Sequence, residues 1–325
     1  MDERRVIVVV GAGRSGTSAL TRGIGALGVE LGDKLRSASG KNPRGFYEDR
    51  DLTRINHALR DIFGCRRSAA GVAPIPPARF DERAVQDLAG EAAALIQHRF
   101  GAFSLWGFKA GGVLNFLPFW QGVFAKAGFR PSYVLALRNP VSVARSRARL
   151  DRWRGNQQNC DLEFLTRVVP YFRRAAQHPT SVVDYDCLMA DAKGELLRVA
   201  DDLELPVTEA TSRSLETYAN AFLTERLHHA RPGNMDLDAH PALSPLARDT
   251  YRALYGAAGT GGPGLAHPGF WREWARIEET YAAMIPVLRH IDDLDAQARR
   301  SVTGLVHNAR NLVRRGLHSA VPGYA

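Results

Sequence analysis

The feature that most constrains the fold is a short apolar run followed by a glycine-rich segment near the N-terminus. Val6–Val10 is β-branched and uninterrupted, as in a central strand of a parallel sheet. GAGRSGTSAL (11–20) follows directly and leads into a predicted helix over Ser15–Leu27. A strand, a glycine loop and a helix in this order bring free backbone N–H groups and the positive end of a helix dipole to one point. The segment therefore predicts an anion-binding site at the carboxyl end of the first strand.

Hydrophobic runs alternate with helical patterns along the first two thirds of the chain. This alternation indicates a parallel sheet with helices on both faces, so we predict a three-layer α/β fold of the P-loop-like kind. Beyond Pro206 the pattern becomes mostly helical. The predicted strands are Val6–Val10, 105–109, 132–138 and 180–186, and the predicted helices include Ser15–Leu27, Arg50–Asp61, Asp81–Arg99, one that starts at Pro140 and one that ends at Leu203.

A glycine- and proline-rich segment divides the last third of the chain. We predict a main domain over residues 1–255, a linker over 256–269 with the sequence GAAGTGGPGLAHPG, and a helical C-terminal extension over 270–325. Two helices, Phe270–Ile291 and Asp295–Arg315, are expected in that extension.

The glycines of the loop satisfy two phosphate-binding templates. Gly11, Gly13 and Gly16 spell the dinucleotide pattern G-x-G-x-x-G, whereas the first and last of them frame a P-loop in which Thr17 stands at the lysine position. A dinucleotide site needs an acidic residue at the end of a second strand, and GVELGDKL (28–35) makes a poor, glycine-broken strand. A nucleoside triphosphatase needs the lysine and a Walker-B strand, which does not stand out here. The sequence therefore fits neither the dinucleotide template nor the nucleoside triphosphatase template in full.

A different set of residues can bind a terminal sulfate or phosphate without a metal. Arg14 offers a fork of donors, and Thr17 and Ser18 begin the helix. In LALRNPVSVARS, Arg138 ends a predicted strand and Ser146 lies about two helical turns further on. Because ligands of open parallel sheets bind at the carboxyl ends of the strands, this pair either binds a second phosphate of the same nucleotide or is an unrelated surface arginine and serine.

Together the two segments resemble the sulfotransferase superfamily, which uses 3′-phosphoadenosine 5′-phosphosulfate. GAGRSGTSAL is similar to the family loop G-x-x-[RK]-[SG]-G-[TS], which binds the 5′-phosphosulfate. RNPVSVARS is similar to R-[DN]-P-x-x-x-x-x-S, which binds the 3′-phosphate. NPRGFYEDRDLTRINHAL (42–59) and LWGFK (105–109) resemble a bacterial branch often seen with saccharide biosynthesis, and DYDCLMADAKGELLRVADDLELP (184–206) resembles its strand–helix segment. The resemblance covers roughly residues 5–232 and departs at GFKAGG, where many relatives have K-D-P-R.

The resemblance implies transfer of a sulfuryl group to a hydroxyl of a saccharide or other small molecule by in-line displacement. Such a reaction depends on positioning and on charge neutralisation, and the co-substrate would be 3′-phosphoadenosine 5′-phosphosulfate with no metal. Arg14 would stabilise the departing phosphate, and Lys109 would be a second cation. The residues that the resemblance assigns to the nucleotide are Gly13, Arg14, Ser15, Gly16, Thr17, Ser18, Arg138 and Ser146.

The resemblance also implies a general base, because the acceptor hydroxyl must lose its proton. Glu48, in GFYED, is the leading candidate, and Asp49 and His57 are the alternatives. Equally, Glu48 could serve only as a salt-bridge partner of Arg44 or Arg50.

Two further groups of residues have alternative interpretations. The segment ERLHHARPG (225–233) is either a lid over the nucleotide or a solvated loop, and three aromatic residues either line an acceptor pocket or belong to the core. The basic residues of the first group are Arg226, His228, His229 and Arg231, and the aromatic residues are Trp106, Phe119 and Trp120.

Composition and charge limit the class of protein. A net charge of +9 with 45% hydrophobic residues is typical of a globular protein and suits a polyanionic ligand, an acidic acceptor or an anionic surface. The widely separated cysteines Cys65, Cys160 and Cys187 argue against a disulfide framework and a zinc site. The first apolar run is too short for a signal peptide, so the cytoplasm is the expected compartment.

Two classes of function compete with sulfuryl transfer. One is another nucleotide-dependent enzyme, either a P-loop kinase-like enzyme or an NAD-dependent one, and the other is a non-catalytic scaffold of the same fold. A small-molecule or glycan acceptor is the expected partner, and nucleic acid is not. The basic, amphipathic segment from Arg299 onward could contact a membrane surface or, in preference, pack on its own domain or a second copy of the chain.

Overall fold

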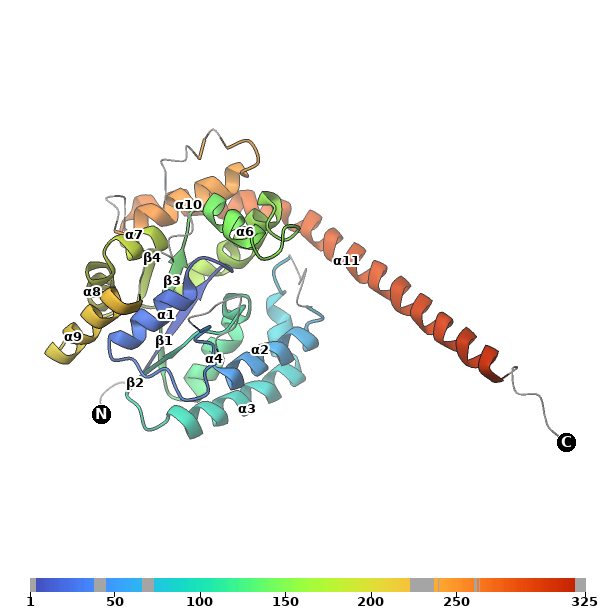
Figure 1. Ribbon diagram of the computed structural model, residues 1–325, viewed down its shortest axis with the longest axis horizontal. Helices are drawn as coiled ribbons and strands as arrows, with labels where there is room; N and C mark the ends of the chain where they lie inside the picture. The colour runs from blue at the N-terminus through green and yellow to red at the C-terminus, as the bar shows by residue number, and fades with distance from the viewer. Residues whose placement is uncertain are drawn as a thin grey trace.

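The protein is an α/β fold built around a parallel sheet. The structure, a computed structural model, describes residues 4–37, 45–65, 73–222, 237–238, 240–259, 262 and 264–318. Within these residues one sheet has the strand order β2-β1-β3-β4, with all pairs parallel (Figure 1). The strands are β1 (Arg5–Gly11), β2 (Leu105–Phe108), β3 (Arg130–Leu137) and β4 (Thr180–Asp184).

The strand order fixes where a ligand can bind. The chain runs from β1 to β2 on one side and then crosses to β3 on the other side of β1. The crossover connections therefore leave the sheet in opposite directions from β1 and β3, which opens a crevice at their carboxyl ends. Gly11 and Ala136 are register partners at that edge. The predicted phosphate loop and the predicted Arg138 segment follow these two strands and thus lie on either side of the crevice.

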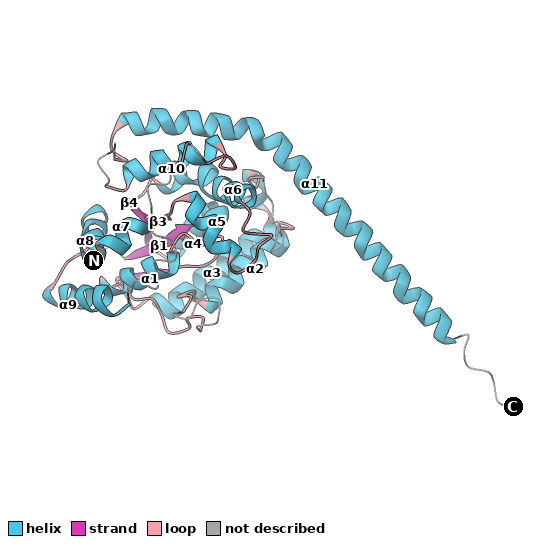
Figure 2. Cartoon of the chain, turned by 45° about the horizontal axis from the view of Figure 1, so that its top comes forward, coloured by secondary structure: helices cyan, strands magenta, loops and turns pink. Residues whose placement is uncertain are grey.

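Helices cover both faces of the sheet and complete the predicted three-layer fold (Figures 1 and 2). Alternate residues of β1 separate the two cores, because successive side chains of a strand point to opposite faces. Val6, Val8 and Val10 pack with α2, α3, α4, α6, α10 and α11, whereas Ile7 and Val9 pack with α1, α8 and α9. The helices are α1 (Thr17–Ala26), α2 (Arg50–Ile62), α3 (Arg83–Phe100), α4 (Leu117–Lys126), α5 (Pro140–Ala148), α6 (Gln157–Ala175), α7 (Tyr185–Ala190), α8 (Ala192–Asp202), α9 (Glu209–Thr217), α10 (Pro245–Ala257) and α11 (Pro268–His318).

The predicted strands and most predicted helices are confirmed within a few residues. One helix was missed and two helical predictions were wrong. Helix α6 was not predicted. The helix expected to end at Leu203 is two helices, because Asp191 interrupts the first and caps α8 by accepting a hydrogen bond from the Gly194 N–H. The two helices expected at the C-terminal end are one, α11. The aspartates between them have modest helix propensity, yet the segment 292–294 contains no glycine or proline to end the helix.

The first half of α11 belongs to the main core. Phe270, Trp274 and Tyr281 are buried, and Arg173 on α6 forms a two-point ion pair with Glu278. Further along, α11 runs away from the body of the fold (Figures 1 and 2). Across the described residues, every helix falls short of the length and apolarity that crossing a lipid bilayer requires.

Candidate active site

The loop after β1 has a backbone that requires glycine. Gly16 occupies the N-cap position of α1 in the left-handed region, with φ at 90°. A Cβ atom there would overlap the ring of Tyr185. Gly16 provides no capping side chain, and the first turn of α1 contains no acidic residue. The N-terminus of α1 is therefore open to an anion from outside the helix.

The two predicted anchors meet across the crevice. The guanidinium of Arg14 donates from Nε and Nη2 to the hydroxyl of Ser146, at 3.3 and 3.2 Å. Arg138 Nη1 donates to the carbonyl of Arg14 at 3.3 Å. Burial lowers the pKa of Arg14, and the neighbouring charges of Arg138 and Arg147 lower it further. This clustering of cations indicates a site for a strongly negative group.

Arg138 is a buried cation with unused donors. Its guanidinium stacks on Tyr185 at 4.2 Å from the ring centre, and the residue is only 7% exposed. The Nε and Nη2 atoms of Arg138 are buried and have no hydrogen-bond partner among the described residues. Leaving charged donors buried and unpaired costs stability, so an anionic ligand that accepts from them would recover that cost. A phosphate fits these donors.

A pair of side chains that the sequence did not indicate holds the loop from behind. Glu163 on α6 forms an ion pair with Arg147, and Arg147 Nη2 donates to the Gly13 carbonyl at 3.3 Å. Arg167 adds a second ion pair to Glu163 at 3.2 Å. Burial alone would raise the pKa of Glu163, but the two arginines and the Gly13 N–H lower it to about 2. Gly13, a residue predicted to bind the nucleotide, is thus held at its carbonyl by the Arg147–Glu163 ion pair.

Lys109 reaches the loop from the neighbouring strand. It follows β2 directly, and its Nζ donates to the hydroxyl of Ser18 in the first turn of α1 at 3.0 Å. The same Nζ lies 3.5 Å from Oε1 of Glu48. Burial lowers the pKa of Lys109, while the nearby Glu48 carboxylate opposes that shift. A lysine from the end of β2 therefore contacts the first turn after the loop, although the loop sequence itself contains no lysine.

Glu48 is held by two cations at the entrance of a cavity. Its Oε2 accepts from Arg36 Nη1 at 3.1 Å, and its side chain is 15% exposed. Of the two arginines considered as its salt-bridge partner, Arg50 instead donates to Ser37, and Arg44 lies outside the described residues. Glu48 thus contacts Lys109 on one side and the cavity on the other.

The alternative base Asp49 has a structural role. Its carboxylate caps α2 by accepting from the N–H groups of Asp51 and Leu52, both at 3.0 Å, and it pairs with Arg99 at 2.8 Å. Asp49 is fully buried, so an acceptor hydroxyl cannot reach it without displacing these bonds. His57, the other alternative, lines the cavity.

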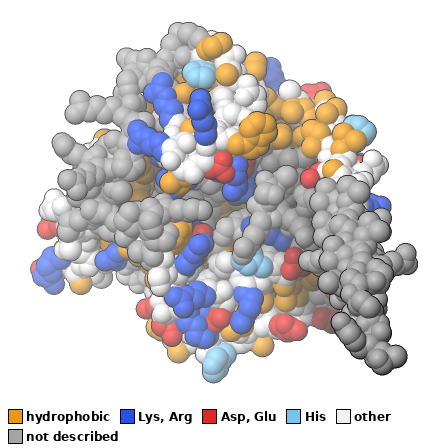
Figure 3. All heavy atoms as spheres, turned by 45° about the vertical axis from the view of Figure 1, so that its right-hand side comes forward, with side chains coloured by type: hydrophobic (Ala, Val, Ile, Leu, Met, Phe, Trp, Pro, Cys, Tyr) orange, Lys and Arg blue, Asp and Glu red, His pale blue; other side chains and the backbone are white. Residues whose placement is uncertain are grey.

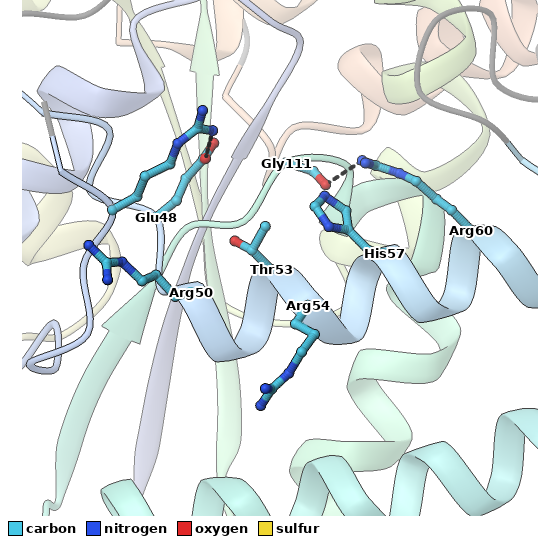
Figure 4. A pocket seen from close by; sticks show the side chains of 8 residues that line it. Glu48, Arg50, Thr53, Arg54, His57, Arg60 and Gly111 are labelled. Carbon is cyan, nitrogen blue, oxygen red and sulfur yellow. Dashed lines mark hydrogen bonds and ion pairs between the residues drawn. The ribbon is translucent and has the colours of Figure 1, made fainter. Parts of the chain in front are cut away.

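The cavity lies beside Glu48 along α2 and has a volume of about 530 Å³. Figure 4 shows Thr53, His57 and Arg60 on the same side of α2, facing Gly111. Arg60 Nη2 donates to the Gly111 carbonyl at 2.7 Å. The lining residues are Arg36, Glu48, Arg50, Thr53, Arg54, His57, Arg60 and Gly111.

The aromatic candidates from the sequence do not line this cavity. Trp106, Phe119 and Trp120 are core residues, each at most 4% exposed, so the acceptor-pocket interpretation of these aromatics is wrong. Trp120 instead donates to Asn56 Oδ1 at 2.8 Å. The segment with Arg226, His228, His229 and Arg231 lies outside the described residues. Among described residues, no three His, Cys, Asp or Glu side chains are grouped as metal ligands.

The chain is similar to several solved structures at low sequence identity. No protein-family model and no curated protein sequence matches it. It is similar to the sulfotransferase STF1 from Mycobacterium tuberculosis H37Rv, with 17% identity, a TM-score of 0.39, and coverage of 69% of this chain and 75% of that one. The sulfotransferase domain of the Synechococcus PCC 7002 olefin synthase has 16% identity and a TM-score of 0.38, with 87% and 97% covered. Retinol dehydratase in a complex with retinol and PAP has 14% identity and a TM-score of 0.33, with 67% and 65% covered. Because these sequence identities are low, the function of this chain must be inferred from the chemistry of its own site.

Proposed function

We propose that this protein is a sulfotransferase that moves a sulfuryl group from 3′-phosphoadenosine 5′-phosphosulfate to a hydroxyl of a saccharide or another small molecule. One observation carries the proposal. The ammonium of Lys109 contacts both the Ser18 hydroxyl of the phosphate loop and the Glu48 carboxylate at the cavity. A single cation therefore joins a site for a donor to a site for an acceptor.

The nucleotide would be bound by residues on both sides of the crevice. The N–H groups at the start of α1 and the side chains of Arg14 and Ser18 suit the 5′-phosphosulfate. Arg138, with its unused buried donors, and Ser146 suit the 3′-phosphate. The bound nucleotide would supply the sulfuryl group.

The chain's own residues divide the remaining work of transfer. Glu48 would accept the proton of the acceptor hydroxyl at a carboxylate oxygen. Because Lys109 is buried, its ammonium would interact strongly with negative charge that develops on the transferred group and the leaving oxygen. Arg14 would hold the departing phosphate. Positioning and charge neutralisation suffice for an in-line displacement of this kind.

Ligand binding tests the proposal directly. Adenosine 3′,5′-bisphosphate should raise the melting temperature with a chelator present. At a ligand concentration of one hundred times its dissociation constant, the free energy of unfolding should rise by about 2.7 kcal/mol. Stabilisation only by ATP with magnesium, or only by NAD, would instead support the competing nucleotide-dependent enzymes.

A variant of Glu48 tests the catalytic part. Glu48→Gln keeps the shape and removes the proton acceptor, so turnover with an identified acceptor should fall by about 10²- to 10⁴-fold. Affinity for adenosine 3′,5′-bisphosphate should change little. Unchanged turnover would remove Glu48 from the mechanism, and nucleotide binding without any turnover would favour a scaffold. The free cysteines fit the cytoplasm as the compartment of this enzyme.

A further inference from the structure

The cavity beside Glu48 is unusually rich in arginine. Four of its eight lining residues are arginines, one is a histidine, and Glu48 is its one carboxylate. Its volume of about 530 Å³ is in the range of small-molecule sites. The face of the molecule drawn in Figure 3 likewise carries several groups of Lys and Arg side chains. A neutral acceptor would not need this surplus of positive charge.

The carboxylates near the cavity in the part of the chain that the structure describes do not cancel the surplus. Glu48 already pairs with Arg36 and Lys109. Asp51 lies close to the rim, but it pairs with Lys34 at 3.0 Å, Arg54 at 3.3 Å and Arg99 at 3.4 Å, so cations outnumber it as well.

Two of the cavity arginines are held by neutral oxygens. Arg60 donates to the Gly111 carbonyl at 2.7 Å, and Arg50 donates to the Ser37 hydroxyl at 3.0 Å. Arg50 forms no ion pair with a carboxylate among the described residues. The guanidinium of Arg50 is therefore oriented without a carboxylate partner among the described residues, and its planar fork suits a phosphate or carboxylate. Arg54 differs, because it is 73% exposed and turns to Asp51.

The polar groups follow one another along α2. Thr53, His57 and Arg60 are four and three residues apart, which places them in one row on the helix surface (Figure 4). The hydroxyl of Thr53 is buried and has no hydrogen-bond partner among the described residues. From Glu48 outward, the row thus offers an unpaired hydroxyl, an imidazole and a guanidinium.

We propose that the acceptor carries its own anionic group, a phosphate or a carboxylate, and that His57 and Arg60 bind this group. The proposal rests on the proposed function, since it treats the cavity as the acceptor site. Thr53 hydrogen-bonds the acceptor near its reacting hydroxyl, which faces Glu48. The anion is bound further along α2, so His57 is a binding residue rather than a base.

Calorimetry with four probes tests the acceptor class on the full chain. Glucose 6-phosphate and glucuronate should bind in this cavity, whereas glucose should bind at least about 10-fold more weakly. Inorganic phosphate shows whether an anion alone accounts for the binding. Binding of glucose as tight as that of both anionic sugars, or of inorganic phosphate as tight as that of glucose 6-phosphate, would overturn the proposal.

Variants locate the site. Arg60→Gln should weaken the preferred anionic sugar about 10- to 100-fold, and Arg60→Lys should recover part of the loss because it keeps the charge. Arg83→Gln is the matched control, because the Arg83 side chain on α3 is 94% exposed and lies outside the cavity, so the affinity should change less than about 2-fold. Equal effects of Arg60→Gln and Arg83→Gln would refute the assignment. Melting temperatures identify any variant that fails to fold.

Measurements with and without adenosine 3′,5′-bisphosphate separate this proposal from the proposed function. If the bisphosphate does not bind but anionic sugars still bind through Arg60, the sulfotransferase assignment fails and the anion preference of the cavity remains. If the bisphosphate binds and no anionic sugar is preferred over glucose, the acceptor class proposed here is wrong while the donor site stands.

Discussion

Glu163, with its ion-pair partners Arg147 and Arg167, forms a clamp behind the loop that follows β1. Replacing Glu163 by glutamine tests whether this clamp stabilises the fold. Its pKa of about 2 compares with an ordinary value of 4.5, and a shift of this size corresponds to about 3 kcal/mol. An independent route gives a similar size, because removing one partner of a buried ion pair costs about 3–5 kcal/mol. Glu163→Gln should therefore lower the free energy of unfolding by about 3 kcal/mol at pH 7.

The pH dependence has a definite sign. Glu163 has a lower pKa in the folded protein than in the unfolded chain, so its contribution is fully present above pH 4.5 and is lost as the pH falls toward 2. The wild-type chain should lose this contribution on acidification, and the glutamine variant has none to lose. Between pH 7 and pH 4 the difference in free energy of unfolding should narrow by about 1 kcal/mol.

Urea denaturation at several pH values, followed by circular dichroism, measures both quantities. Glu209→Gln is the matched control, because Glu209 pairs with Arg213 on the exposed surface of α9 and its side chain is 86% exposed. That variant should be nearly neutral. A Glu163→Gln penalty that stays constant from pH 7 to pH 4, or one no larger than that of Glu209→Gln, would refute the electrostatic account of the clamp.

Three further predictions concern the proposed nucleotide site and the C-terminal helix. Arg138→Ala should weaken adenosine 3′,5′-bisphosphate by about 1.5–3 kcal/mol but spare adenosine 5′-phosphosulfate, which lacks the 3′-phosphate; equal losses in calorimetry would assign Arg138 another role. Gly16→Ala should lower the melting temperature and abolish nucleotide binding, whereas Gly90→Ala, where a Cβ has open space within α3, should be neutral or stabilising. Deletion of residues 296–325 should leave the packed first half of α11 in place. It should change either the oligomeric state, measured by analytical ultracentrifugation, or the binding to anionic vesicles, measured by sedimentation. If neither changes, the end of the helix has neither role.

The parts of the fold that could be predicted have local causes. Val6–Val10 reads as a buried strand because β-branched residues run without interruption, and the glycines after it mark a turn that other residues cannot make. Arg138 and Ser146 belong to one short segment whose proline marks the start of α5. For these residues, nearest neighbours in the sequence are sufficient evidence.

The parts that were missed depend on contacts between distant segments. The ion pair of Glu163 with Arg147, which also donates to the Gly13 carbonyl, joins α6 to the loop after β1, and no spacing rule relates these residues. The cavity row on α2 was not recognised because its members are ordinary polar residues of a surface helix. The role of Asp49 did have a local signal, since aspartate directly before a helical pattern is a favoured N-cap. Applying that rule would have left Glu48 as the available carboxylate of the pair.

The lysine that the loop lacks is provided by the register of the sheet. β2 pairs with β1 in parallel, and Val8 is the partner of Phe108. The residue after Phe108 is therefore level with Val9, near the carboxyl end of β1 and the loop that follows it. Lys109 occupies this position and contacts Ser18. A lysine at position 17 would belong to the loop alone, whereas an ammonium at the end of β2 can also contact Glu48, so this one cation links the loop after β1 to the Glu48 carboxylate.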